Sequence, residues 1–274
     1  MTQDSSALIA SGAQAVQARI PDFPKTAIVL GSGLGGFAKG LVDATTVPYG
    51  DIPGFSRSTV VGHSGNLIAG TLEGKRIAVM QGRIHTYEGH GGAAIATPIR
   101  ILKRLGVETL ILTNAAGGLN LDLGPGSIVM IEDHINFSGF NPLIGPNDDS
   151  FGPRFPDMSD PYDRELRAKL EAAAAVAGVA IKKGVYIFVL GPNFETAAEI
   201  RMFAKLGADL VGMSTVPECL VARHAGMKVA GISIVTNYGT GIKSTQQTHE
   251  ETLATAEQAG QRLEQLLRVF VQRI

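Results

Sequence analysis

The sequence predicts an α/β layered fold, because short segments rich in Val and Ile alternate with segments of helical periodicity along its 274 residues. Several of the short segments are apolar at consecutive positions, which is typical of strands that helices cover on both faces. No internal repeat and no low-complexity linker interrupts this alternation. We therefore expect one domain that spans residues 1–274.

Six segments have the length and composition of strands and are punctuated by Gly or Asn: residues 25–30, 76–81, 109–114, 126–133, 184–190 and 229–237. Helices are expected between or after them, over residues 93–105, 161–177, 195–206 and 216–226 and from about 248 to 272. The last helix repeats large apolar side chains at helical spacing, namely Leu253, Leu263, Leu266, Leu267 and Phe270.

One long stretch, residues 134–161, has no helical or strand pattern. Irregular stretches beyond about 15 residues inside a compact domain are usually functional or disordered. This stretch carries apolar anchors among its turn residues: Ile135, Phe137, Phe140, Ile144 and Phe155. We expect such a loop to pack on something and not to extend freely into solvent.

Composition and charge exclude several classes of protein. Hydrophobic residues make up 45% of the chain, and Lys+Arg (24) nearly balances Asp+Glu (25) without a basic stripe, so nucleic acid and anionic membranes are not expected partners. The single cysteine, Cys219, excludes a disulfide within the chain. The first twenty residues lack the features of a signal peptide, and no apolar run approaches the ~20 residues of a membrane span. We expect a soluble, cytoplasmic protein.

Residues 27–37, "AIVLGSGLGGF", form an apolar run that breaks into glycines with the spacing G-x-G-x-x-G. A strand, a glycine turn and a helix N-terminus would together present backbone N–H groups to an anion. A tight turn, a small-anion site and a dinucleotide site all fit this motif. Asp51 has the spacing of a ribose-binding acid, but its surroundings, rich in Pro and Gly, do not resemble a strand end. The hydroxyl of Ser32 inside the loop favours phosphate or a phosphate ester.

Three further strand ends carry groups that suit phosphate. Arg83 and His85 are two residues apart, so both side chains point the same way on an extended chain. An Arg fork and an imidazole donor complement phosphate oxygens, although a surface arginine and a structural histidine would give the same pattern. Small residues around Ala115 allow its backbone N–H to approach a ligand, and Ser214 ends another strand. Ligands of open α/β sheets bind at the carboxyl ends of strands.

A second group of residues suits a flat ligand with polar edges. Phe194 and Glu195 stand at the start of a predicted helix, where an acid is also favoured by the helix dipole alone. Asn237 ends a strand and offers both a donor and an acceptor, but an asparagine is equally common at the start of a turn. Met213 is as compatible with a core position as with a ligand contact.

Taken in order, these segments resemble purine nucleoside phosphorylase of the trimeric, low-molecular-mass type. The resemblance extends from about residue 25 to the C-terminal helix and rests on long blocks: "GSGLGG", "GHSG", "QGRIHTYEGH", "TNAAGGLN", "GPNDDSFGPRFPDMSDPYD", "GPNFETAAEIR", "GMSTVPE" and "VTN". It implies an α/β/α sandwich with a mixed, barrel-like central sheet, and a homotrimer with shared active sites. It also implies phosphorolysis of purine nucleosides, with inorganic phosphate as co-substrate and no metal or organic cofactor.

The resemblance assigns a role to each matching position. Phosphate would be held by Ser32, His63, Arg83, His85, the backbone of Ala115 and Ser214. The nucleoside would contact Tyr87, Phe194, Glu195, Met213, Asn237 and His249, with Phe155 reaching over from a neighbouring subunit. The catalytic groups would be His85, Glu195 and Asn237.

The chemistry implied by these residues favours 6-oxopurines. A Glu195 carboxylate accepts a hydrogen bond from N1–H of hypoxanthine or guanine, which adenine lacks. Methylthioadenosine phosphorylase, on the same scaffold, would be expected to carry Asp in place of Asn237 and an apolar residue in place of His249. An NAD-dependent oxidoreductase would rest on the glycine segment alone. A non-catalytic purine sensor would not need the phosphate residues. The loop after Asn237, "YGTGIK", varies within the family.

Overall fold

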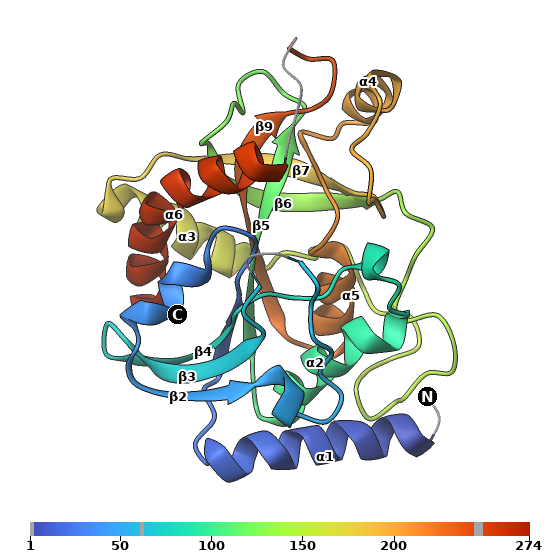
Figure 1. Ribbon diagram of the computed structural model, residues 1–274, viewed down its shortest axis with the longest axis vertical. Coiled ribbons are helices and arrows are strands. Elements are labelled where there is room, and N and C mark those ends of the chain that lie inside the picture. The colour runs from blue at the N-terminus through green and yellow to red at the C-terminus, as the bar shows by residue number, and fades with distance from the viewer. Residues whose placement is uncertain (1–2, 61–62, 244–248) are drawn as a thin grey trace.

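The computed structural model describes residues 3–60, 63–243 and 249–274 (Figure 1). The strands are β1 (Thr26–Val29), β2 (Val42–Pro48), β3 (Asn66–Leu72), β4 (Lys75–Met80), β5 (Thr109–Gly118), β6 (Ile128–Asn136), β7 (Ile181–Phe188), β8 (Leu210–Gly212) and β9 (Lys228–Tyr238). The α-helices are α1 (Gln3–Arg19), α2 (Gly92–Arg104), α3 (Arg164–Ala177), α4 (Ala197–Lys205), α5 (Val216–His224) and α6 (His249–Gln272). Three short 3₁₀ helices are η1 (Gly35–Gly40), η2 (Tyr49–Asp51) and η3 (Thr86–Glu88).

All the strands belong to one mixed sheet with the order β2-β3-β4-β1-β5-β8-β7-β6-β9. Because β5 also pairs with β9 in parallel, the five strands β5, β8, β7, β6 and β9 close into a barrel. Strands β1 to β4 extend the sheet from β5 outward. The predicted α/β fold with a mixed, barrel-like sheet is confirmed.

Helices cover both faces of the sheet, as the continuous apolar strands predict (Figure 1). Helices α1, α2 and α5 pack on one side of the sheet, whereas α3 and α6 pack on the other. Strand β1 and the residue after it are buried on both faces of the sheet. Ala27 and Val29 belong to one core cluster, and Ile28 and Leu30 belong to the other. Cys219 of α5 is buried and free.

The predicted strands and helices are all present, with ends displaced by a few residues, and the strand expected before Ser214 is β8, with three residues. Helix α1 and strands β2 and β3 were not predicted. Helix α1 has only three large apolar residues, Leu8, Ile9 and Val16, so its helical periodicity is weak. Strand β2 is largely exposed. Strand β3, which lies beside β2, was also missed. The helix N-terminus expected after the glycine segment is wrong: the 3₁₀ helix η1 follows instead, and the chain then enters β2.

Strand β2 lies at the open end of the sheet and pairs with β3 on one side. Its pairing shifts register between Val42 and Thr45, which marks a bulge. Asp43 within this bulge has a φ of 50°, and Pro48 ends the strand.

The long irregular stretch begins after β6 and reaches α3, and its packing differs from the expectation. Phe140 packs against the main core, and Ile135, which belongs to β6, packs against a smaller cluster. Phe137 is 47% exposed, but its ring lies edge-on to that of Phe203 in α4, with 5.2 Å between the ring centroids. Ile144 and Phe155 are 77% and 86% exposed, so within this chain the expected packing is seen for three of the five residues.

Candidate active site

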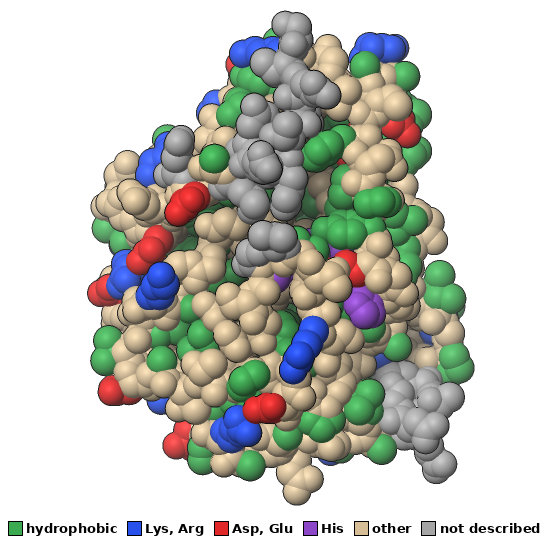
Figure 2. All heavy atoms as spheres, viewed as in Figure 1, with side chains coloured by type: hydrophobic (Ala, Val, Ile, Leu, Met, Phe, Trp, Pro, Cys, Tyr) green, Lys and Arg blue, Asp and Glu red, His purple; other side chains and the backbone are tan. Residues whose placement is uncertain are grey.

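One cleft gathers ten of the predicted site residues from segments that are far apart in the sequence. They come from the glycine segment, the chain after β4, strands β5 and β9, and the segments before α4 and α5. These lining residues are Ser32, Arg83, His85, Tyr87, Ala115, Phe194, Glu195, Met213, Ser214 and Asn237. On the face shown in Figure 2, Lys, Arg, Asp and Glu side chains are scattered without a single-sign stripe.

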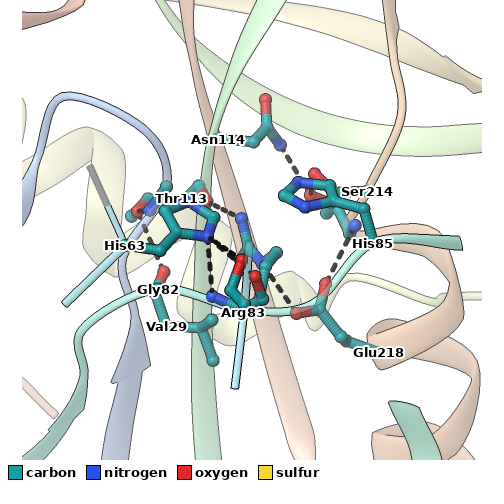
Figure 3. Close-up of polar contacts among 12 residues, drawn as sticks. Val29, His63, Gly82, Arg83, His85, Thr113, Asn114, Ser214 and Glu218 are labelled. Carbon is teal, nitrogen blue, oxygen red and sulfur yellow. Dashed lines mark hydrogen bonds and ion pairs between the residues drawn. The ribbon is translucent and has the colours of Figure 1, made fainter. Parts of the chain in front are cut away.

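Arg83 is the buried cation of the cleft, with 4% of its surface exposed. Its Nε donates to Oε1 of Glu218 over 2.7 Å, and its Nη1 donates to the carbonyl of Thr113 over 2.6 Å (Figure 3). Its Nη2 is buried and has no hydrogen-bond partner among the described residues. The alternative of a surface arginine is therefore wrong, and Nη2 is a donor suited to an anion in the cleft.

The glycine segment approaches β5 closely enough that only glycine fits. A Cβ on Gly31 would lie 2.7 Å from Cα of Asn114, and the N–H of Gly31 donates to Oγ1 of Thr113 over 3.1 Å. Thr113 Oγ1 in turn donates to the carbonyl of Val29 over 2.9 Å. These contacts hold Ser32 at the edge of the cleft.

Three aromatic rings stack beside Arg83. The ring centroids of His63 and His85 are 5.4 Å apart at 19°, and those of His85 and Tyr87 are 4.8 Å apart at 13°. His63 lies outside the cleft lining, but its Nε2 is 3.5 Å from the Ser32 hydroxyl and its Nδ1 is 2.7 Å from the Arg83 carbonyl oxygen. Burial, reinforced by the neighbouring His85, lowers the pKa of His63 to about 4.

Glu88 holds this histidine stack in place, and the sequence analysis did not identify it. Its carboxylate accepts from the backbone N–H of His85 over 2.6 Å and from the N–H and hydroxyl of Thr59 over 2.6 and 2.8 Å. Burial alone would raise the pKa of Glu88, but hydrogen bonds from His85 and Thr59 hold it well below its usual range. The signal available in the sequence was the spacing of three between His85 and Glu88, which forms a capping box around η3.

Ser214 is presented by a turn of unusual conformation. The next residue, Thr215, has φ 74° and ψ −52°, and the N–H of Val216 donates to the carbonyl of Ser214 over 2.8 Å. These values describe a γ-turn with a positive φ, which is strained for a β-branched residue. Such strain concentrates at functional sites, where the surrounding structure enforces it.

The same cleft is also lined by Phe194, Glu195, Met213 and Asn237. Glu195 is buried and precedes α4, whose N-terminus is capped by Thr196 and Glu199. The interpretation of Glu195 as an acid in the first helical turn is therefore wrong. Burial raises the pKa of its carboxyl, and Glu199 adds to this effect.

Asn237 belongs to β9, beside Gly117 of β5, so it does not start a turn. Its Oδ1 accepts from the Thr236 hydroxyl over 2.8 Å, and its Nδ2 donates to the carbonyl of Tyr238 over 3.1 Å. These contacts fix the orientation of an amide that faces the same cleft as Glu195.

Besides His63, two of the predicted residues lie outside this cleft or outside the described part of the chain. Phe155 is 86% exposed, and the Arg154 guanidinium lies 5.8 Å from its ring centroid. The alternative that Phe155 packs in its own core is therefore wrong. His249 is the first residue of α6, and its side chain is not among the described residues.

Asp51 lies in η2 and forms an ion pair with Arg19 at 3.1 Å, so the acid that a dinucleotide site requires is not at a strand end. Within residues 3–60, 63–243 and 249–274, no group of three or more His, Cys, Asp and Glu side chains could hold a metal ion. In the same part of the chain, no helix has both the length and the apolar character needed to cross a membrane.

Comparison with known proteins gives consistent matches. The family model of the phosphorylase superfamily matches residues 25–272. Purine nucleoside phosphorylase 1 of Geobacillus stearothermophilus is 50% identical, over 91% of this chain and 91% of that protein, and the Bos taurus purine nucleoside phosphorylase is 48% identical over 90% and 88%. The crystal structure of Schistosoma mansoni purine nucleoside phosphorylase in complex with inosine superimposes with a TM-score of 0.93 at 41% identity, covering 98% of this chain and 96% of that one.

Proposed function

The chain belongs to the phosphorylase superfamily, and we propose that it catalyses the reversible phosphorolysis of 6-oxopurine ribonucleosides and deoxyribonucleosides. The products are the free purine and α-ribose-1-phosphate or its deoxy form. The observation that carries this proposal is the composition of the cleft. A buried arginine, with a donor that has no partner among the described residues, lines the same cleft as a buried glutamate and an asparagine amide.

Phosphate binds at the end of the cleft formed by Ser32, Arg83, His85, the backbone of Ala115 and Ser214, with His63 behind Ser32. One phosphate oxygen attacks C1′ of the sugar as the bond from C1′ to N9 breaks, and the bonding electrons leave with the purine. The sugar gains positive charge on the way, so a fixed anion below C1′ serves as both nucleophile and counter-charge. Tyr87 and Met213 contact the sugar between the two ends.

The purine binds at the other end, where charge accumulates on the departing base. Phe194 covers the face of the base, Asn237 donates to N7, and the Glu195 carboxylate accepts from N1–H. The contact to N7 strengthens as the bond breaks, which is the condition for catalysis. His249 carries the remaining nucleoside contact, to the 5′-hydroxyl, as the family resemblance implies.

The resemblance also supports a homotrimer in which Phe155 of one subunit covers the sugar in the site of the next. In this chain the 86% exposure of Phe155 supports that arrangement. The reaction as proposed needs inorganic phosphate and no metal or organic cofactor. We place the enzyme in purine salvage in the cytoplasm.

Incubation of inosine with and without phosphate tests the proposal, with hypoxanthine and ribose-1-phosphate as the measured products. We expect hypoxanthine release that depends on phosphate, with guanosine as a second substrate and adenosine and methylthioadenosine as poor ones. Release without phosphate would indicate a hydrolase, and binding without release would indicate a sensor.

A further inference from the structure

Glu218 is a buried carboxylate in the first turn of α5, behind Arg83 and outside the residues that line the cleft. Its Oε1 accepts from Nε of Arg83 over 2.7 Å (Figure 3). Its Oε2 accepts from the backbone N–H of Thr215 over 2.9 Å. One side chain therefore holds the arginine on one side of the phosphate end and the turn that presents Ser214 on the other.

The contact with Glu218 determines the direction of the free donor of Arg83. Glu218 fixes Nε, and the carbonyl of Thr113 fixes Nη1 over 2.6 Å. A guanidinium is planar and rigid, so fixing two of its nitrogens also fixes the third, Nη2. Nη2 is the buried donor that has no partner in the described part of the chain.

The second oxygen of Glu218 stabilises a strained turn. Thr215 keeps a positive φ of 74°. Its N–H donates to Glu218, and its Oγ1 accepts from Nδ2 of Asn114 over 2.9 Å. Because Ser214 is the first residue of this turn, the position of its hydroxyl depends on these contacts.

Comparison of two helix N-termini shows that capping alone does not require this carboxylate. Helices α4 and α5 each begin with a capping box, Thr196 with Glu199 and Thr215 with Glu218. A glutamine serves a capping box as well as a glutamate does. At position 218, however, two donors approach two oxygens, and an amide would turn its NH₂ group toward either Arg83 or Thr215.

The geometry points to Glu218 as the positioning residue of the phosphate end, which sets the Arg83 donor and the Ser214 turn in one arrangement for an incoming phosphate. This inference rests on the proposed function. Glu218 also places a negative charge close to the phosphate, so its removal has an opposite effect that would tighten phosphate binding. We expect misplacement of the Arg83 and Ser214 donors to outweigh this opposite effect. A displacement of about 1 Å in a binding group already lowers a rate by as much as a hundredfold.

The test is Glu218→Gln, which keeps the cap of α5 and removes the paired acceptor. We expect the KM for phosphate to rise about tenfold, as for the loss of a hydrogen bond to a charged group, while the KM for inosine stays within about twofold. Glu199→Gln is the matched control, since it makes the same change in a capping box that does not contact Arg83, and its KM for phosphate should stay at the wild-type value. An unchanged or lowered KM for phosphate in folded Glu218→Gln would overturn the inference.

The same substitution in an Arg83→Ala background separates positioning from a structural role. If Glu218 acts through Arg83, its substitution there should change the KM for phosphate much less than in the wild type. An equal rise in both backgrounds would show that Glu218 supports the fold and does not position Arg83. If Glu218→Gln does not fold, Glu218→Asp keeps the charge but is too short for both donors, so it should give the same rise, and a wild-type KM would overturn the inference.

The rise in Tm caused by inorganic phosphate provides a readout that does not depend on turnover. A wild-type protein that phosphate stabilises but that releases no hypoxanthine would contradict the proposed function and leave the role of Glu218 testable. In that assay, equal phosphate-induced shifts for Glu218→Gln and the wild type would contradict the inference alone.

Discussion

The two ends of the cleft are built differently. At the phosphate end, Arg83 is 4% exposed and is fixed by Glu218 and Thr113. At the base end, Phe194 is 42% exposed, and hydrophobic side chains gather on the surface below α4 (Figure 2). The phosphate end is therefore preorganised for an anion common to every substrate, whereas the base end combines the fixed amide of Asn237 with a partly exposed aromatic ring. This difference predicts that variants at the two ends affect separate kinetic constants.

Arg83→Ala tests the phosphate end and has the largest expected effect. Loss of a charge-assisted hydrogen bond should raise the KM for phosphate about ten- to a hundredfold and lower turnover, with purine binding little changed. Steady-state kinetics with phosphate as the varied substrate measure this. Because the variant leaves Glu218 buried and unpaired, its free energy of unfolding must be measured as well. An equal rise in the KM for phosphate and in the KM for inosine would contradict the distinction between the two ends.

Asn237→Asp tests the base end. A protonated carboxyl could donate to N7 while its other oxygen accepts from a 6-amino group, so kcat/KM for inosine should fall at least about tenfold and the relative use of adenosine should improve. Asn193→Asp is the control, since it makes the same chemical change at an exposed position close to Phe194. A specificity ratio that does not move would show that Asn237 does not contact the base.

Phe155→Ala asks whether another subunit completes the part of the cleft that holds the sugar, between the two ends. A ring that is 86% exposed contributes little to the stability of its own chain, so Tm should be nearly unchanged while the KM for inosine rises several-fold. Ile144→Ala, on the same stretch and 77% exposed, should leave both values unchanged.

Mixed oligomers sharpen this test. Combining Phe155→Ala chains with Arg83→Ala chains should restore some sites in which both residues are intact, so activity should exceed the sum of the parents. If subunit exchange is confirmed and the activity equals that sum, Phe155 does not act across subunits.

His63, beside the phosphate end, makes the stability of the protein depend on pH. Its pKa is about 4 in the folded chain and about 6.5 when unfolded, so the unfolded chain binds more protons between these values. The stabilisation is complete above about pH 6.5 and is lost as the pH falls toward 4, with a slope of up to about 1.4 kcal/mol per pH unit. Urea unfolding at several pH values should show a shallower slope for His63→Gln, and parallel curves would contradict this.

The parts of the site that lie at strand ends could be predicted from the sequence, because the carboxyl ends of strands are where ligands of α/β sheets bind. Arg83 and Ser214 were found in that way, whereas Ala115, which was also expected at a strand end, lies within β5, which continues to Gly118. Glu88 and Glu218 were not, because an acid three residues after a cap indicates a helix start, and their second contacts come from distant segments. Strand β2 was missed for a related reason: its stability depends on pairing with β3, and its own residues carry little apolar pattern.

Closure of the barrel through β5 and β9 leaves β2 as the open end of the described sheet. An unpaired strand edge can recruit the edge of another molecule and begin aggregation. The bulge at Asp43 interrupts the straight ladder that such recruitment needs, and Pro48 offers no N–H to it. Strand β2 therefore protects the protein from association through its sheet edge, and removal of both features should increase its tendency to form fibrils.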